Sequence, residues 1–118
     1  CVIEEEKAVA DIEAIAATPG IDVLFIGTSD LSFSLGLRGR QNEPALEQAI
    51  DTIVAAARRH NKYLGRPARS AEQIQKFRQK GFQVFQSVTE LGLMELGAGE
   101  ILRPLGIVPS TKDKSILY

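Results

Sequence analysis

Residues 20–36 read GIDVLFIGTSDLSFSLG and contain the clearest strand signal of the chain. A Pro19-Gly20 turn signal precedes an apolar run at 23–26, which is short enough for a strand and apolar on both faces. That pattern is typical of a strand buried in a parallel sheet. A glycine ends the run, and a small polar segment leads to Asp30. The stretch therefore predicts a buried strand with an acidic residue just past its carboxyl end.

Asp30 is a candidate functional residue because of where it falls. Loops at the carboxyl edge of a parallel sheet converge on one crevice, and ligands bind there in α/β folds. An acid at that edge is a candidate metal or substrate group. The alternative is that Asp30 caps a short helical turn beginning at Leu31. The residues alone leave both interpretations open.

The rest of the chain repeats the same strand-then-helix order four times. Apolar residues at helical spacing follow each short apolar run, and Ser70 with Gln73 gives a capping-box signature before the third helix. The sequence predicts strands at 1–3, 23–26, 62–65 and 82–86, and helices that carry residues 8–16, 44–60, 71–80 and 89–102. Four such units fit a small open α/β sheet or half of an eight-fold barrel, which has about 250 residues. We expect one domain over 1–106 and a tail at 107–118.

Glu4 occupies the same place after the first strand that Asp30 occupies after the second. The two strands are sequential neighbours, and adjacent parallel strands lie about 4.8 Å apart. Both carboxylates are therefore expected to reach a shared point above the sheet. The alternative for Glu4 is a favourable charge at a helix N-terminus.

Composition excludes several classes of protein. The net charge of −1 and ordinary charged fraction of 25% give no electrostatic footprint for nucleic acid or an anionic membrane surface. No apolar run approaches transmembrane length. One cysteine, Cys1, excludes an internal disulfide and a cysteine-based zinc cluster, which fits a reducing, cytoplasmic setting. The chain starts without methionine inside an expected strand, so it reads as the middle of something larger.

Three motifs follow one another along the chain: VIE at residues 2–4 before a helix, then IDVLFIGTSDLS at 21–32 and SLG at 34–36. Together they resemble the HpcH/HpaI aldolase family. Members of this family are metal-dependent (class II) pyruvate aldolases, and the resemblance runs from Cys1 to about Gly106. It implies an α/β fold equivalent to the C-terminal half of a TIM barrel of the phosphoenolpyruvate/pyruvate type. It also implies metal-dependent carbon–carbon lyase chemistry on a 2-oxo acid through a pyruvate enolate.

The resemblance also implies roles for particular residues. Glu4 and Asp30 would hold a divalent metal, Mg²⁺ or Mn²⁺ with Co²⁺ as a further candidate, and the backbone amides at Ser29 and Asp30 would take the carboxylate of pyruvate. Two carboxylates suit a hard cation and leave positions open for a bidentate keto acid. Separately, Arg66 lies in the expected loop after the third strand, where it is a candidate contact for an anionic substrate tail or part of a solvated loop.

The chain departs from the family pattern in three ways. Thr28 stands where the family usually has Pro, and Val2 where it often has Gln. The first half of the barrel is absent, and with it the family's catalytic His and keto-acid-binding Arg. His60 ends a helix at the opposite edge of the sheet, so it is no replacement. Lys62 precedes its strand, which disfavours a Schiff-base mechanism.

These departures leave two hypotheses. The first is an aldolase that is incomplete in this chain, and the second is a non-catalytic half-barrel module that keeps vestigial metal ligands. Half a barrel exposes strand edges and an apolar interior, which a monomer in water tolerates poorly. We therefore expect a homo-oligomer or a missing N-terminal half.

Overall fold

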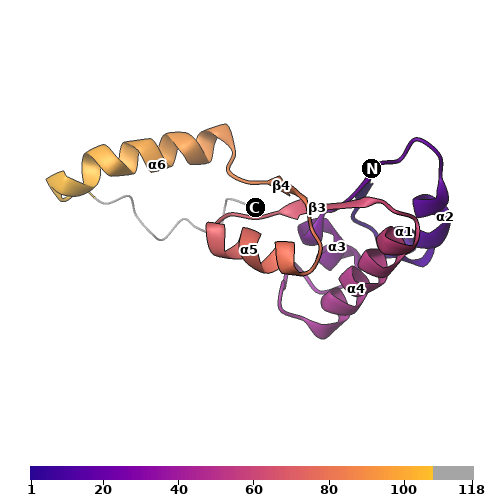
Figure 1. The fold of residues 1–118 in the computed structure, drawn as a ribbon. Helices are drawn as coiled ribbons and strands as arrows, with labels where there is room; N and C mark the ends of the chain where they lie inside the picture. The colour runs from indigo at the N-terminus through magenta and orange to yellow at the C-terminus, as the bar shows by residue number, and fades with distance from the viewer. Residues whose placement is uncertain (108–118) are drawn as a thin grey trace. The chain divides into compact units, whose positions relative to one another are not determined.

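The computed structural model describes residues 1–107, which alternate short strands and helices along the chain (Figure 1). The first two strand–helix repeats comprise β1 (Val2–Ile3), α1 (Glu6–Ala10), α2 (Ile12–Ala17), β2 (Val23–Ile26), α3 (Thr28–Ser34) and α4 (Pro44–Arg59). The last two comprise β3 (Tyr63–Pro67), α5 (Ala71–Gln79), β4 (Val84–Gln86), α6 (Glu90–Leu102) and the 3₁₀ turn η1 (Arg103–Leu105).

The chain divides into two compact units, residues 1–87 and residues from 88 onward. Each is described separately. A single domain over 1–106 remains a prediction. The expected tail at 107–118 lies outside the described residues except for Ile107.

The first unit is built on a four-stranded parallel sheet in the order β1-β2-β3-β4. Ile3 pairs with Ile26, Leu24 pairs with Leu64, and Gly65 pairs with Val84. Each strand therefore lies beside the strand that precedes it in the chain, as strand–helix repeats require when each connection crosses one face of the sheet. This arrangement confirms the expected α/β fold of four strand–helix units.

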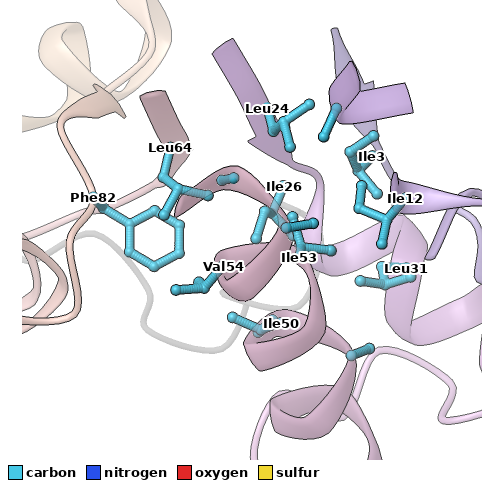
Figure 2. Close-up of a cluster of buried hydrophobic side chains, with 14 of the residues drawn as sticks. Ile3, Ile12, Leu24, Ile26, Leu31, Ile50, Ile53, Val54, Leu64 and Phe82 are labelled. Atoms are coloured by element: carbon cyan, nitrogen blue, oxygen red, sulfur yellow. The ribbon is translucent and has the colours of Figure 1, made fainter. Parts of the chain in front are cut away.

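The core lies between one face of this sheet and the helices. Leu24, Ile26 and Leu64 point from the strands toward α4, which contributes Ile50 and Ile53 (Figure 2). α4 has this buried stripe because its apolar residues recur at helical spacing, as the sequence predicts. Burial of these side chains fixes which face of each strand is turned toward the helices.

The strand residues that alternate with these buried ones point to the other face of the sheet. Val2, Tyr63 and Val84 on this face are 57%, 58% and 38% exposed. The expectation that β2 is buried on both faces is therefore wrong for this chain, because Val23 and Phe25 are only half-buried. Within residues 1–87 the helices pack on one side of the sheet, and they leave this apolar face open to solvent.

Several element boundaries differ from the sequence prediction. β4 begins at Val84 rather than at Phe82, because the Phe82 N–H instead bonds to the Phe77 carbonyl at the end of α5. The first helix is interrupted at Asp11, whose φ of −94° and ψ of 10° end α1 before α2 begins. α3 begins at Thr28 rather than at Leu31, so Asp30 is inside the helix and does not cap it. β3 continues to Pro67, which places Arg66 in the strand rather than in the following loop.

Other local signals are confirmed. Gly20 has a φ of 83°, as the glycine of a Pro-Gly turn requires. Ser70 is the N-cap of α5, and its Oγ accepts a 3.2 Å hydrogen bond from the Gln73 N–H. The reciprocal contact of the capping box is shifted by one residue, because Gln73 Oε1 accepts from the Arg69 N–H at 2.8 Å.

The second unit, in its described part, is α6 followed by η1. Thr89 is the N-cap of α6, and its Oγ1 accepts from the Gly92 N–H at 3.2 Å, which confirms the expected start of this helix. Apolar side chains are exposed along it. No helix within residues 1–107 is both long and apolar enough to cross a membrane.

Candidate functional site

Glu4 and Gly27 occupy equivalent places at the carboxyl ends of β1 and β2. The pairing of Ile3 with Ile26 continues one residue further, where the Gly27 N–H donates a 3.0 Å hydrogen bond to the Ile3 carbonyl. Glu4 therefore lies opposite Gly27, on the face of the sheet that also carries Val2. Gly27 is also the N-cap of α3.

Asp30 follows from this position as the third residue of α3. The segment after β1 is tied to the same helix, because the Glu6 N–H donates a 2.9 Å hydrogen bond to Ser34 Oγ. The predicted pair of carboxylates, Glu4 and Asp30, thus comes from neighbouring segments at one edge of the sheet. Both residues are exposed there.

Neither carboxylate is engaged by a protein cation. Among the described residues 1–107, Glu4 and Asp30 take part in no ion pair and no side-chain hydrogen bond. The same residues contain no cluster of three or more His, Cys, Asp or Glu side chains placed to hold a metal. Glu4 and Asp30 alone would not complete the coordination of a hard cation, which takes about six oxygen ligands.

The first turn of α3 presents backbone N–H groups at the same edge. The Leu31 N–H is the first to bond within the helix, to the Gly27 carbonyl at 2.9 Å, so the amides of the preceding residues have no helical acceptor. Ser32 Oγ donates to the Ser29 carbonyl at 2.8 Å, and Gln41 Nε2 donates to the Thr28 carbonyl at 3.3 Å. These bonds hold the turn in place, and its free amides favour an anionic group.

Arg66 points to the opposite face of the sheet from Glu4. It follows Gly65 in β3 and shares the face of Leu64, where its guanidinium carbon is 3.7 Å from the centre of the Phe77 ring. The side chain is 9% exposed, and its Nε is buried without a hydrogen-bond partner within residues 1–107. Burial lowers the pKa of Arg66, and the nearby Glu47 carboxylate opposes this shift. The structure therefore does not bring Arg66 together with Glu4 and Asp30.

His60 is at the other edge of the sheet. It caps the C-terminus of α4, three residues before β3 begins, and its Nε2 is 3.0 Å from Glu13 Oε2. This placement agrees with the prediction that His60 lies far from the carboxylates. In the sequence Gly27 only marks the end of a strand, although its position opposite Glu4 follows from aligning the two strand ends.

Comparisons with known proteins bear on this edge of the sheet. The sequence model described as HpcH/HpaI aldolase/citrate lyase matches residues 1–95. A 5-keto-4-deoxy-D-glucarate aldolase of Salmonella arizonae is 31% identical over 99 residues, which are 84% of this chain and 39% of that protein. One of Klebsiella pneumoniae is 44% identical over 63 residues, which are 53% of this chain and 25% of that protein. The chain thus spans 25–39% of the length of these curated relatives.

Solved structures agree. An HpcH/HpaI aldolase/citrate lyase family protein from Burkholderia cenocepacia superposes with a TM-score of 0.81 at 27% identity, over 90% of this chain and 41% of that one. An HpcH/HpaI aldolase from Desulfitobacterium hafniense, at 24% identity and a TM-score of 0.78, shows the same fold over 92% of this chain and 42% of that one. With a family match over most of its length, the chain belongs to the HpcH/HpaI aldolase/citrate lyase family.

Proposed function

We propose that this chain supplies the metal-binding half of an aldolase active site, which cleaves or forms a carbon–carbon bond of a 2-oxo acid through the enolate of pyruvate. Membership of the HpcH/HpaI family supports the reaction class. The observation that carries the proposal is the pair Glu4 and Asp30, which follow adjacent parallel strands at one edge and have no cationic partner within residues 1–107.

The two side chains fit a divalent metal ion. Carboxylate oxygens are the ligands that Mg²⁺ and Mn²⁺ prefer, and Co²⁺ accepts them as well. We propose that Glu4 and Asp30 hold one such ion. When bound, the ion supplies Lewis-acid stabilisation of the negative charge that develops as pyruvate loses a methyl proton.

The chain's own residues also orient the substrate in this proposal. The free amides at Ser29 and Asp30 donate to the carboxylate of pyruvate, and the N-terminal end of α3 adds a favourable partial positive charge. Contact between Arg66 and an anionic substrate tail remains a hypothesis. The burial of its side chain against Phe77 favours a packing role instead.

Proton transfer needs a group from outside this edge. The one histidine of the chain, His60, is at the opposite end of the strands. We therefore propose that a second half-barrel supplies the acid–base group and covers the open apolar face of the sheet. It is either another copy of this chain or a preceding segment of a longer polypeptide.

Deuterium exchange at the methyl group of pyruvate tests the proposal. In D₂O with Mn²⁺ or Mg²⁺, we expect the proton NMR signal of the methyl group to decay, because enolisation exchanges its hydrogens. Asp30→Ala should reduce the exchange rate to that of metal and pyruvate without protein. Asp22→Ala is the matched control, because Asp22 is an exposed aspartate at the amino end of β2, and it should leave the rate unchanged.

Each result of the exchange experiment supports or contradicts a different part of the proposal. Metal-dependent exchange that is lost in Asp30→Ala supports an enolising site built on this carboxylate. Equal exchange by the native chain and Asp30→Ala contradicts the assignment of Asp30. No exchange by a folded native chain that binds Mn²⁺ contradicts catalysis by copies of this chain alone. The acid–base group would then come from a preceding segment of a longer polypeptide, or the chain is a non-catalytic half-barrel.

A further inference from the structure

Gly27 lies directly against the Glu4 side chain. Built onto the Gly27 backbone, a Cβ atom would be 3.0 Å from Glu4 Cβ, 3.1 Å from Glu4 Oε2 and 3.5 Å from Val2 Cγ1. The first two separations are tighter than nine in ten contacts that real Cβ atoms make, so Glu4 would have to shift by a few tenths of an ångström. A side chain at position 27 would therefore be too close to the Glu4 side chain.

The need for glycine here concerns space and not backbone conformation. Gly27 has a φ of −80° and a ψ of 79°, which an L-amino acid adopts without a left-handed backbone. Gly20, with its φ of 83°, is the opposite case, because its neighbourhood is empty and only its backbone angle favours glycine. Alanine at position 27 would thus act through its methyl group alone.

The atom that the methyl group would displace is a proposed ligand. Glu4 Oε2 lies beside the N-cap of α3, the helix that carries Asp30 two residues into its first turn. Glu4 Cβ is also crowded, so the shift is not absorbed by the far end of a flexible side chain. Moving the carboxylate by a few tenths of an ångström changes its separation from Asp30.

We propose that Gly27 is a positioning residue for metal binding: its missing side chain lets the Glu4 carboxylate lie against the start of α3, within reach of the ion that Asp30 binds. This inference rests on the proposed function, since it assumes that Glu4 is a ligand. It adds a residue that touches neither metal nor substrate and acts only through Glu4.

Co²⁺ binding to the full chain, followed by visible absorption, tests the inference. In Gly27→Ala we expect the affinity to fall about 10-fold to 100-fold, the range typical of residues that orient a metal ligand. At saturating Co²⁺ the spectrum of Gly27→Ala should move toward that of Glu4→Ala, because the ligand set loses or weakens one carboxylate. Gly97→Ala is the matched control, since Gly97 is in α6 with nothing within 4 Å of its Cβ position.

A role in stability alone predicts a different result. Gly27→Ala would then melt at a lower temperature but would keep the native Co²⁺ spectrum and affinity in its folded fraction, and this result overturns the inference. No Co²⁺ binding by the native chain contradicts the proposed function first. Native binding that Gly27→Ala leaves unchanged contradicts only the role of Gly27.

A second variant keeps the test decisive if Gly27→Ala folds poorly. Glu4→Asp retains the charge and shortens the side chain by one methylene, so the carboxylate no longer reaches its place beside Gly27. We expect it to lower the Co²⁺ affinity by a similar factor. Native affinity and spectrum in Glu4→Asp would mean that this placement is unimportant, and would overturn the inference.

Discussion

The guanidinium of Arg66 stacks on Phe77 and lies 5.4 Å from the centre of the Phe82 ring. A cation over an aromatic face gains electrostatic attraction, but burial removes the water that would otherwise solvate it. Burial lowers the pKa of Arg66 for this reason, and the buried Nε has no hydrogen-bond partner within residues 1–107. The attraction to the rings and the loss of solvation therefore oppose each other at this guanidinium.

Substitution of Arg66 separates packing from charge. Arg66→Met keeps a long apolar side chain over Phe77 and removes the buried charge, so we expect the free energy of unfolding to stay the same or to rise by about 1 kcal/mol. Arg66→Ala leaves a cavity and should lower it by about 2 kcal/mol. Urea denaturation measures both. Weaker binding of the keto acid by an Arg66→Met variant of unchanged stability would support the hypothesis of a substrate contact.

The place of the two carboxylates in the fold could be predicted from the sequence, but the surroundings of Arg66 could not. Glu4 and Asp30 each follow a short apolar run, so chain order alone places them at one edge of a parallel sheet. The strand around Arg66 has a weak apolar signal that includes Gly65, and its carboxyl end was predicted two residues early. Because side chains alternate between faces, the face that receives each residue depends on the position of the strand.

At the scale of elements, α2 and α4 are joined by polar contacts at the amino edge of the sheet. Glu13 of α2 pairs with Arg59 and His60 at the end of α4. The hydrogen bond from His60, and then that from Arg59, hold the pKa of Glu13 below its usual 4.5. The folded chain therefore favours ionised Glu13 more strongly than the unfolded chain does.

This difference sets the expected dependence of stability on pH. The contribution of Glu13 is fully present above pH 4.5 and is lost as the pH falls through the lowered pKa of the folded state. Glu13→Gln should therefore be less stable than the native chain near neutral pH, and the gap should close in acid. Urea denaturation at several pH values measures it, and a gap that stays constant or widens in acid contradicts the assignment.

Elements were easier to predict than their ends. The stripe of α4 and the caps of α5 and α6 are local signals, so these helices begin where the sequence indicates within one residue. The break at Asp11 was missed because the apolar spacing continues through it, with Val9 and Ile12 on either side. Backbone bends of this kind depend on how the segment packs and leave little trace in the pattern.

At the scale of the whole molecule, the open face of the sheet sets the state of association. Its exposed side chains Val2, Tyr63 and Val84 come from three strands of one sheet, and such a surface is typical of a binding site. We expect the isolated chain to sediment as a dimer or larger species. Tyr63→Lys should shift it toward the monomer, whereas Gln48→Lys on the exposed side of α4 should not.

Sedimentation velocity over a range of concentrations measures both variants. A native chain that remains monomeric throughout would contradict association through this face. In that case a segment preceding these residues in a longer polypeptide would be the remaining candidate for covering it.

The order β1-β2-β3-β4 also has a consequence for synthesis on the ribosome. Each strand pairs with the strand translated just before it, so the sheet grows at one side only, in the direction in which the chain emerges. Glu4 follows β1 and Asp30 lies in the helix that follows β2, so the pairing of these two strands can place both segments at one edge before β3 emerges. The edge that carries both acids is thus assembled by the first pairing available within this sheet, and β3 and β4 extend a framework that is already in place.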